Sequence, residues 1–130
     1  MPVVHIEVRR QYSPAEEQAL IESVHAALVC SLQIPEHDRI VRLSVHPPER
    51  FACPTDKVQP ERFTLISIDL FSGRSPAAKR KLYSELAQRL AVLGIPPDHL
   101  LVRLREIPRE DWGIKGLSAV DIDLGFEVEV

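Results

Sequence analysis

The sequence predicts an α/β (α+β) fold: a tandem β-α-β repeat forming a four-stranded mixed sheet with two helices on one face, plus a short C-terminal strand or hairpin tail. Two observations support this prediction. Apolar, β-branched runs of strand type alternate with stripes of leucine at helical spacing. The two halves of the chain also match, since Ser13-Pro14-Ala15 corresponds to Ser75-Pro76-Ala77 and Val41-Arg42-Leu43 corresponds to Val102-Arg103-Leu104.

A chain of 130 residues corresponds to one domain. We expect a first β-α-β unit at residues 2–46, a linker loop at 47–63, a second unit at 64–106 and a tail at 107–130. The linker is rich in proline, and a loop of this length is either functional or a link between two units.

In the first unit, residues 3–8 predict a strand because they are mostly apolar and β-branched. Ser13 and Pro14 suit the N-cap and first position of a helix, which we expect to end near Leu32. Residues 40–45 predict the next strand.

The second unit repeats this order. Residues 64–71 predict a strand, and Ser75-Pro76 begins a helix. Gly94 suits the position just after that helix, and residues 100–105 predict the last strand of the repeat.

The tail lies outside the repeat. Residues 120–124 alternate between apolar and acidic side chains, which predicts a short strand that could pair with the sheet edge of a neighbouring subunit. Two helices cover only one face of the sheet. We expect the other face to be apolar and to be buried by self-association.

Composition excludes several classes of protein. A net charge of −3 favours neither nucleic acid nor an anionic membrane, and no apolar run is long enough to span a bilayer. Cys30 and Cys53 are isolated and indicate free thiols in a reducing cytoplasm. The histidines show no metal-ligand spacing, so we expect neither a metal nor another cofactor.

Pro2 stands where the first strand begins. A small residue after Met1 normally permits removal of the initiator methionine, and Pro2 would then carry a free secondary amine. Burial lowers the pKa of such an amine from its ordinary value of about 7.7–8.0, because desolvation disfavours the cation. The amine would then serve as a general base near neutral pH. The alternative is that a Met-Pro start carries no function.

Comparison of the two copies separates residues that the fold needs from residues that differ. Arg74 precedes the second helix, where Tyr12 precedes the first, and a cation at a helix N-terminus suits an anion. Asp38 corresponds to His99, and it could orient water, pair with a cationic amine or simply shape a turn.

Two further residues are candidates for substrate contact. His25 lies at the edge of the first helix's apolar stripe, where its counterpart is Ala87. Trp112 is the only tryptophan, and it could either wall a pocket or anchor the core. A boundary role remains the alternative for His25.

These residues resemble the tautomerase superfamily, which is marked by an amino-terminal proline on a strand and a duplicated β-α-β unit. The chain length and the segments Ile34-Pro35-Glu36-His37-Asp38-Arg39 and Ser72-Gly73-Arg74-Ser75-Pro76 are most similar to the malonate semialdehyde decarboxylase branch. The resemblance implies a homotrimer.

The resemblance also implies roles for individual residues. Pro2 would be the catalytic amine, Arg74 would bind the substrate carboxylate, and Asp38 would act with the proline and water. His25 matches a histidine of the related cis-3-chloroacrylic acid dehalogenase, and Trp112 matches an aromatic lining position. A second arginine, which both the decarboxylase and the dehalogenase carry just before the matched one, is absent from Phe71-Ser72-Gly73. Arg103 and Ile114 stand where the dehalogenase has a tyrosine and a glutamate, so the resemblance does not extend to dehalogenation.

We therefore expect a cofactor-independent tautomerase that acts on a small keto or enol carboxylic acid. One alternative is a decarboxylase or hydratase of a 3-oxo acid such as malonate semialdehyde. The other is a non-enzymatic module for ligand binding or oligomerisation, which would not need a free Pro2 amine.

Overall fold

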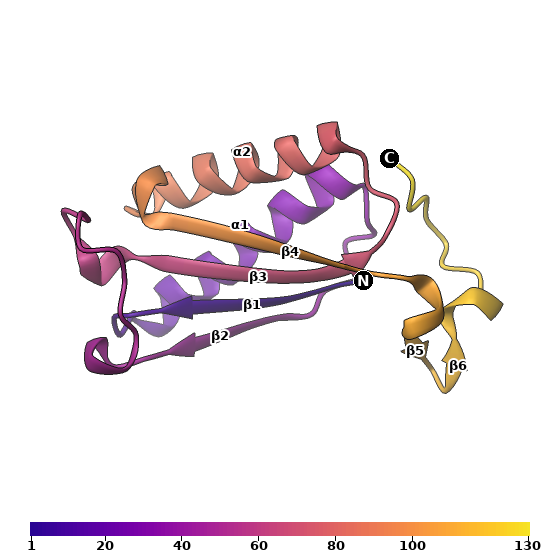
Figure 1. The fold of residues 1–130 in the computed structure, drawn as a ribbon, viewed down its shortest axis with the longest axis horizontal. Coiled ribbons are helices and arrows are strands. Elements are labelled where there is room, and N and C mark those ends of the chain that lie inside the picture. The colour runs from indigo at the N-terminus through magenta and orange to yellow at the C-terminus, as the bar shows by residue number, and fades with distance from the viewer.

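The computed structural model describes all of residues 1–130 and confirms the predicted fold (Figure 1). The first unit runs β1 (Pro2–Val8), α1 (Pro14–Leu32), β2 (Val41–Val45), and the second runs β3 (Thr64–Phe71), α2 (Pro76–Val92), β4 (Leu100–Ile107). The sheet order is β2-β1-β3-β4. Within each unit the strands are parallel, and the two units meet through the antiparallel pair β1 and β3.

Serine caps begin both long helices, but the caps differ in one respect. The Ser13 hydroxyl accepts the Glu16 N–H at 3.2 Å, and the Ser13 N–H donates to the Glu16 carboxylate at 2.9 Å. The Ser75 hydroxyl accepts the Ala78 N–H at 3.0 Å. The side chain of Ala78 cannot accept a hydrogen bond as that of Glu16 does, and the Ser75 N–H donates instead to the Val130 oxygen at 2.9 Å. The helix α2 therefore depends on the C-terminal tail for part of its cap.

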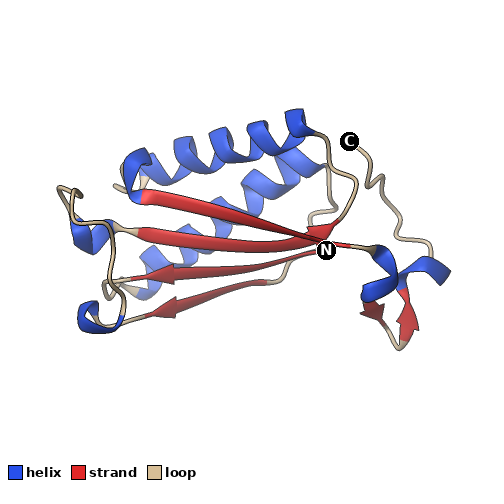
Figure 2. Cartoon of the chain, in the orientation of Figure 1, coloured by secondary structure: helices blue, strands red, loops and turns tan.

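The core lies between the sheet and the two helices, which cover the same face (Figure 2). Alternate residues of β1 point into it, because side chains of a strand alternate between the two faces. Val4, Ile6 and Val8 are fully buried there. Gly94 follows α2 with a φ of +89°, as expected of a residue just after a helix.

The open face of the sheet corrects the expectation of an apolar surface. The outward-facing side chains include His5 and Glu7 on β1, Arg42 on β2, and Arg103 and Arg105 on β4. Asp69 on β3 forms an ion pair with Arg105 at 2.7 Å. Leu65 and Leu101 are interspersed among these groups, so the face is mixed in character and carries charges of both signs.

The linker loop lies at the end of the sheet opposite the N-terminus (Figure 1). It contains two short 3-10 turns, Pro48–Arg50 and Pro60–Arg62. The guanidinium of Arg9 joins them, donating to the Phe51 carbonyl at 2.6 Å and to the Pro60 carbonyl at 2.7 Å. These bonds to backbone oxygens fix the loop against the end of β1.

The tail differs from its prediction. Its strands are β5 (Gly113–Ile114) and β6 (Leu117–Ser118), which pair as a hairpin. Residues 120–124 form no strand, because the Ser118 hydroxyl accepts the Val120 N–H at 3.3 Å and begins a 3-10 turn, Ala119–Asp121. The tail then returns to the N-terminus of α2 within the same chain, rather than extending toward a neighbour's sheet edge (Figure 1). Neither of the two long helices has the length and apolar character needed to cross a membrane.

Candidate active site

A cavity of about 350 Å³ opens beside the chain's amino terminus. Met1, the loop before β2 and the end of β3 form one side, and the tail forms the other. Most of its wall is apolar. Its lining residues are Met1, Pro35, His37, Asp38, Phe71, Ile114, Lys115, Leu117, Ile122, Asp123, Leu124 and Phe126.

The amino group of Met1 forms an ion pair with the Asp38 carboxylate inside this cavity. Burial lowers the pKa of the Met1 amino group below its ordinary value of 8.0, and the Arg74 charge lowers it further, while Asp38 acts in the opposite direction. Pro2 is buried as the first residue of β1, and its nitrogen is joined to the Met1 nitrogen through only two carbon atoms. An amine on Pro2 would therefore emerge in the same part of the cavity.

Backbone contacts hold Asp38 beside this amine. The Asp38 N–H donates to the Pro35 carbonyl at 3.0 Å, which closes a turn ahead of β2. The Val4 N–H donates to the Ile40 carbonyl at 2.9 Å, so β1 and the end of this turn lie side by side. The prediction that Asp38 shapes a turn and the prediction that it pairs with an amine are thus both consistent with its geometry.

His25 does not line the cavity. It is buried on α1, and its Nε2 donates to the Glu36 carbonyl at 2.8 Å. Because Glu36 stands two residues before Asp38, this bond fixes the turn that carries the carboxylate. His25 acts on the site through the backbone of the turn, and its Nδ1 has no hydrogen-bond partner.

Arg74 lies close to the amine but is covered. Only 4% of its surface is exposed, and it lines neither this cavity nor the adjoining one. Its Nη1 donates to the Leu32 carbonyl at 2.8 Å and the Glu127 carbonyl at 3.3 Å, whereas Nε and Nη2 have no partner. Burial lowers the pKa of the Arg74 guanidinium, and the Asp38 charge opposes this shift.

Trp112 serves as an anchor of the tail. Its indole N–H donates to the Ile107 carbonyl at 3.1 Å, and its ring packs edge-on against Phe71 with centroids 5.0 Å apart. Phe71 itself lines the cavity, so Trp112 supports the wall from behind. Trp112 is not among the lining residues, and the aromatic side chains that line the cavity are Phe71 and Phe126, which the sequence comparison did not single out.

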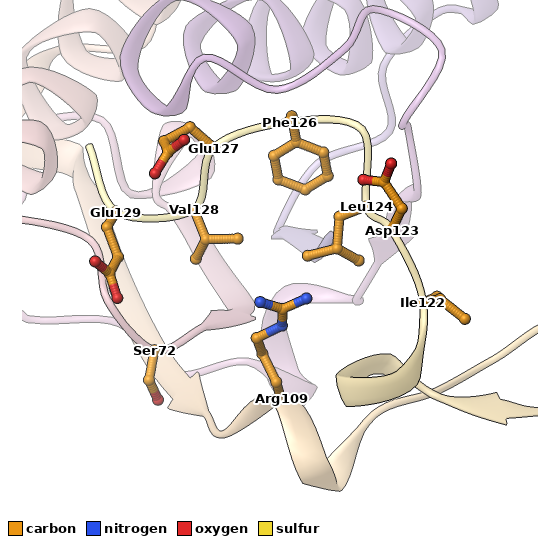
Figure 3. Close-up of a pocket in the computed structure, with 9 residues that line it drawn as sticks. All are labelled: Ser72, Arg109, Ile122, Asp123, Leu124, Phe126, Glu127, Val128 and Glu129. Atoms are coloured by element: carbon orange, nitrogen blue, oxygen red, sulfur yellow. The ribbon is translucent and has the colours of Figure 1, made fainter.

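A second cavity of about 430 Å³ lies on the other side of the tail (Figure 3). The Arg109 guanidinium points toward Leu124 and Val128, while the carboxylates of Glu127 and Glu129 lie farther out (Figure 3). Leu124, Phe126 and their neighbours line both cavities, so this stretch of tail is the partition between them. The repeat gave no signal for these residues because the tail has no counterpart in the first unit.

The position in the second unit that corresponds to Asp38 has a different role. His99, the counterpart of Asp38, is buried, accepts the Gln59 N–H at 3.0 Å and contacts Asp98 at 2.7 Å. It therefore holds the linker and faces no amine. No group of three or more His, Cys, Asp and Glu side chains is gathered in a geometry that could hold a metal ion.

A buried amine that faces a carboxylate in a largely apolar cavity is suited to proton transfer. A family model described as Tautomerase enzyme matches residues 38–115, which is more than half of the chain. The chain belongs to this tautomerase family. The matched segment includes Asp38, the β3–α2 turn and β5, the first strand of the hairpin that lines the cavity.

Individual relatives agree with the architecture. The 2-hydroxymuconate tautomerase of Pseudomonas putida is 34% identical over 56 residues, which are 42% of this chain and 89% of that protein. That relative is thus about half as long as this chain, the size of one β-α-β unit.

Two solved structures share the whole fold. FG41 malonate semialdehyde decarboxylase, inhibited by 3-bromopropiolate, matches with a TM-score of 0.78 and 24% identity over 90% of this chain and 92% of that chain. A symmetric trimer of wild-type Q0 fused 4-OT matches with a TM-score of 0.70 and 29% identity over 91% of this chain and 96% of that chain. The similarity to the malonate semialdehyde decarboxylase branch is therefore confirmed at the level of fold.

Proposed function

We propose that the protein interconverts the enol and keto forms of a small carboxylic acid without a cofactor, using the amine of Pro2 as its base. The observation that carries this proposal is the amino terminus itself. The Met1 amino group lies in a largely apolar cavity, burial lowers its pKa, and the Asp38 carboxylate holds its position. Such an amine is neutral over a wider range of pH than an exposed one and can accept a proton.

Removal of Met1 is part of this proposal. The Met1 side chain lines the cavity, so its loss would both enlarge the cavity and free the Pro2 nitrogen. The amine would begin the strand β1, whose pairing with β3 restricts its movement. A base fixed in this way needs little reorganisation when the substrate arrives.

The proposed reaction moves one proton and breaks no bond between heavy atoms. Neutral Pro2 takes the proton from the enol hydroxyl while the carbonyl forms, and the resulting ammonium delivers that proton to the carbon at the other end of the enol or dienol. Arg74 would bind the substrate carboxylate through a charge-assisted hydrogen bond. The relative from Pseudomonas putida, a 2-hydroxymuconate tautomerase, supports an enol carboxylic acid as the substrate class.

Asp38 favours a second candidate, the decarboxylation or hydration of a 3-oxo acid. A carboxylate against the amine stabilises the ammonium form, which could polarise the 3-oxo group while Asp38 orients water. The shared fold of FG41 malonate semialdehyde decarboxylase supports this candidate.

A panel of enol 2-oxo acids and 3-oxo acids, tested with the wild type and Pro2→Ala, distinguishes the two candidates. For the tautomerase we expect turnover of the enol acids, with kcat/KM rising as pH increases and reaching half of its maximum below pH 8, because burial in this cavity lowers the pKa of the amino group that stands there, that of Met1, below its ordinary value. Release of carbon dioxide from 3-oxo acids, with activity that falls as the amine loses its proton, would support the decarboxylase instead. Turnover of neither class by the wild type would contradict both.

We also propose that the protein is a homotrimer in the cytoplasm. The trimeric state of Q0 fused 4-OT supports the assembly, and Leu65 and Leu101 give the uncovered sheet face apolar area that a neighbouring subunit could bury. The two free cysteines, Cys30 and Cys53, support a reducing compartment.

A further inference from the structure

The last five residues, Phe126–Val130, cover Arg74, and we call them the strap. The Arg74 guanidinium lies 5.8 Å from the centre of the Phe126 ring, and its Nη1 contacts the Glu127 carbonyl. Gly73 faces the same segment, since a Cβ at that position would lie 3.3 Å from the Glu129 side chain. The strap therefore closes over the β3–α2 turn on which Arg74 stands.

The strap also supplies the acceptor for the N–H of Ser75, the N-cap residue of α2. At the start of α1, the Ser13 N–H is satisfied by the Glu16 carboxylate. At the start of α2, the same N–H of Ser75 is satisfied by the Val130 oxygen. The N-terminus of this 17-residue helix thus takes its acceptor from the strap, in a position where a helix favours an anion.

The strap meets only part of the hydrogen-bonding capacity of Arg74. Only its Glu127 carbonyl, which is neutral, contacts the buried guanidinium, and the Nε and Nη2 of Arg74 still have no partner. The carboxylates of Glu127 and Glu129 belong to exposed residues and form no ion pair with Arg74. A small carboxylate would bring the charge and the two oxygen atoms that the site lacks.

We propose that the strap is an autoinhibitory segment that occupies a carboxylate site formed by Arg74 and the Ser75 N–H, and that the carboxylate of a substrate displaces it. This inference rests on the role proposed for Arg74. Gly125, with a φ of +76°, immediately precedes the strap and gives it a point about which to turn. Because Phe126 lines both cavities, displacement would also join them into one space.

Chemical modification of arginine tests this proposal without relying on enzymatic activity. The full chain and a variant that stops after Gly125 are treated with phenylglyoxal, and the rate at Arg74 is measured by peptide mass spectrometry. We expect Arg74 to react at least about tenfold faster without the strap, while Arg50, which is exposed in the linker loop, reacts at the same rate in both proteins. Pyruvate, used as a small carboxylate probe, should slow the reaction of Arg74 in the shortened chain.

Two further variants guard against misfolding of the shortened chain. Phe126→Ala keeps the strap but removes its ring from Arg74, and it should raise the rate at Arg74 by an intermediate factor. Val120→Ser changes an exposed tail residue outside the strap and should leave the rate unchanged.

The proposal would be overturned by an unchanged rate at Arg74 in both strap variants, or by a faster rate that pyruvate does not slow. These readings would stand even if the protein turned over no enol acid, so they separate failure of the strap from failure of the proposed function.

Discussion

At the scale of single residues, the chemistry of the site depends on one amine and the charges beside it. Burial and Arg74 lower the pKa of the Met1 amino group, and Asp38 raises it. The balance between these effects decides whether the amine is a base or a cation at neutral pH. The residues that set this balance lie on three separate segments: β1, the turn before β2, and the turn before α2.

Replacing Asp38 tests this balance. In Asp38→Asn the amine loses the partner that stabilises its protonated form, so its pKa should fall. The rise of kcat/KM with pH should then shift to lower pH, with the plateau rate for enol acids largely retained. Steady-state kinetics across the pH range measures this shift, and a shift to higher pH would show that Asp38 does not face the working amine.

Replacing Arg74 tests recognition of the carboxylate. Arg74→Ala should lower kcat/KM for carboxylate substrates by about one to three powers of ten, the scale of a lost charge-assisted hydrogen bond of about 1.5–3 kcal/mol with some misplacement of the substrate. Arg74→Lys should restore part of this loss, because lysine keeps the charge but lacks the planar fork. Equal kcat/KM values in the wild type and Arg74→Ala would place carboxylate recognition elsewhere.

Comparison of the two repeats identified several of these residues before the structure did. It singled out Pro2, Asp38 and Arg74 as positions that differ between copies, and the structure brings all three to one end of the sheet. The same comparison could not show which way a side chain points. His25 also differs between copies and Trp112 is the only tryptophan, but both act from behind the cavity wall.

At the scale of elements, the sequence predicts the helix ends correctly, because contacts within a few residues of the backbone determine them. The serine caps, the first prolines and Gly94 mark the helix ends through bonds and angles within a few residues. Residues 120–124 alternate like a strand, yet they form a turn and an extended segment, because no neighbouring strand is available to them and Ser118 caps the turn. The open face of the sheet was predicted to be apolar, but its charged side chains alternate with the core residues along the same strands.

The two serine caps give a matched prediction for stability. Ser13→Ala and Ser75→Ala each remove a hydroxyl that accepts a backbone N–H at the start of a helix. Each should lower the free energy of unfolding by about 1 kcal/mol in denaturant titrations. Ser72→Ala, at an exposed residue outside the helices, serves as the control. A loss no greater than that of the control would show that the caps do not stabilise these helices.

At the scale of the whole molecule, the sheet face left open by the helices is the surface available for assembly. We expect light scattering to give a mass about three times the 14.7 kDa of the chain. Leu101 is 55% exposed on β4, and Leu101→Glu should weaken the trimer by adding a charge to this face. Val92→Glu, at a residue that is 86% exposed on α2, should leave it intact. A stable monomer of the wild type at micromolar concentration would contradict the assembly.

The proposed activity depends on the Pro2 amine, and one comparison of rates tests this dependence most directly. The rate of enol-to-keto conversion is measured for the chain beginning at Pro2 and for the same chain retaining Met1, with intact mass verifying each amino terminus. Retaining Met1 converts the Pro2 amine into an amide, which cannot accept the proton, and leaves the Met1 side chain in the cavity. We predict that the chain beginning at Pro2 turns over the enol acid and that the chain retaining Met1 does not. Equal rates for the two chains would show that Pro2 is only the first residue of a strand.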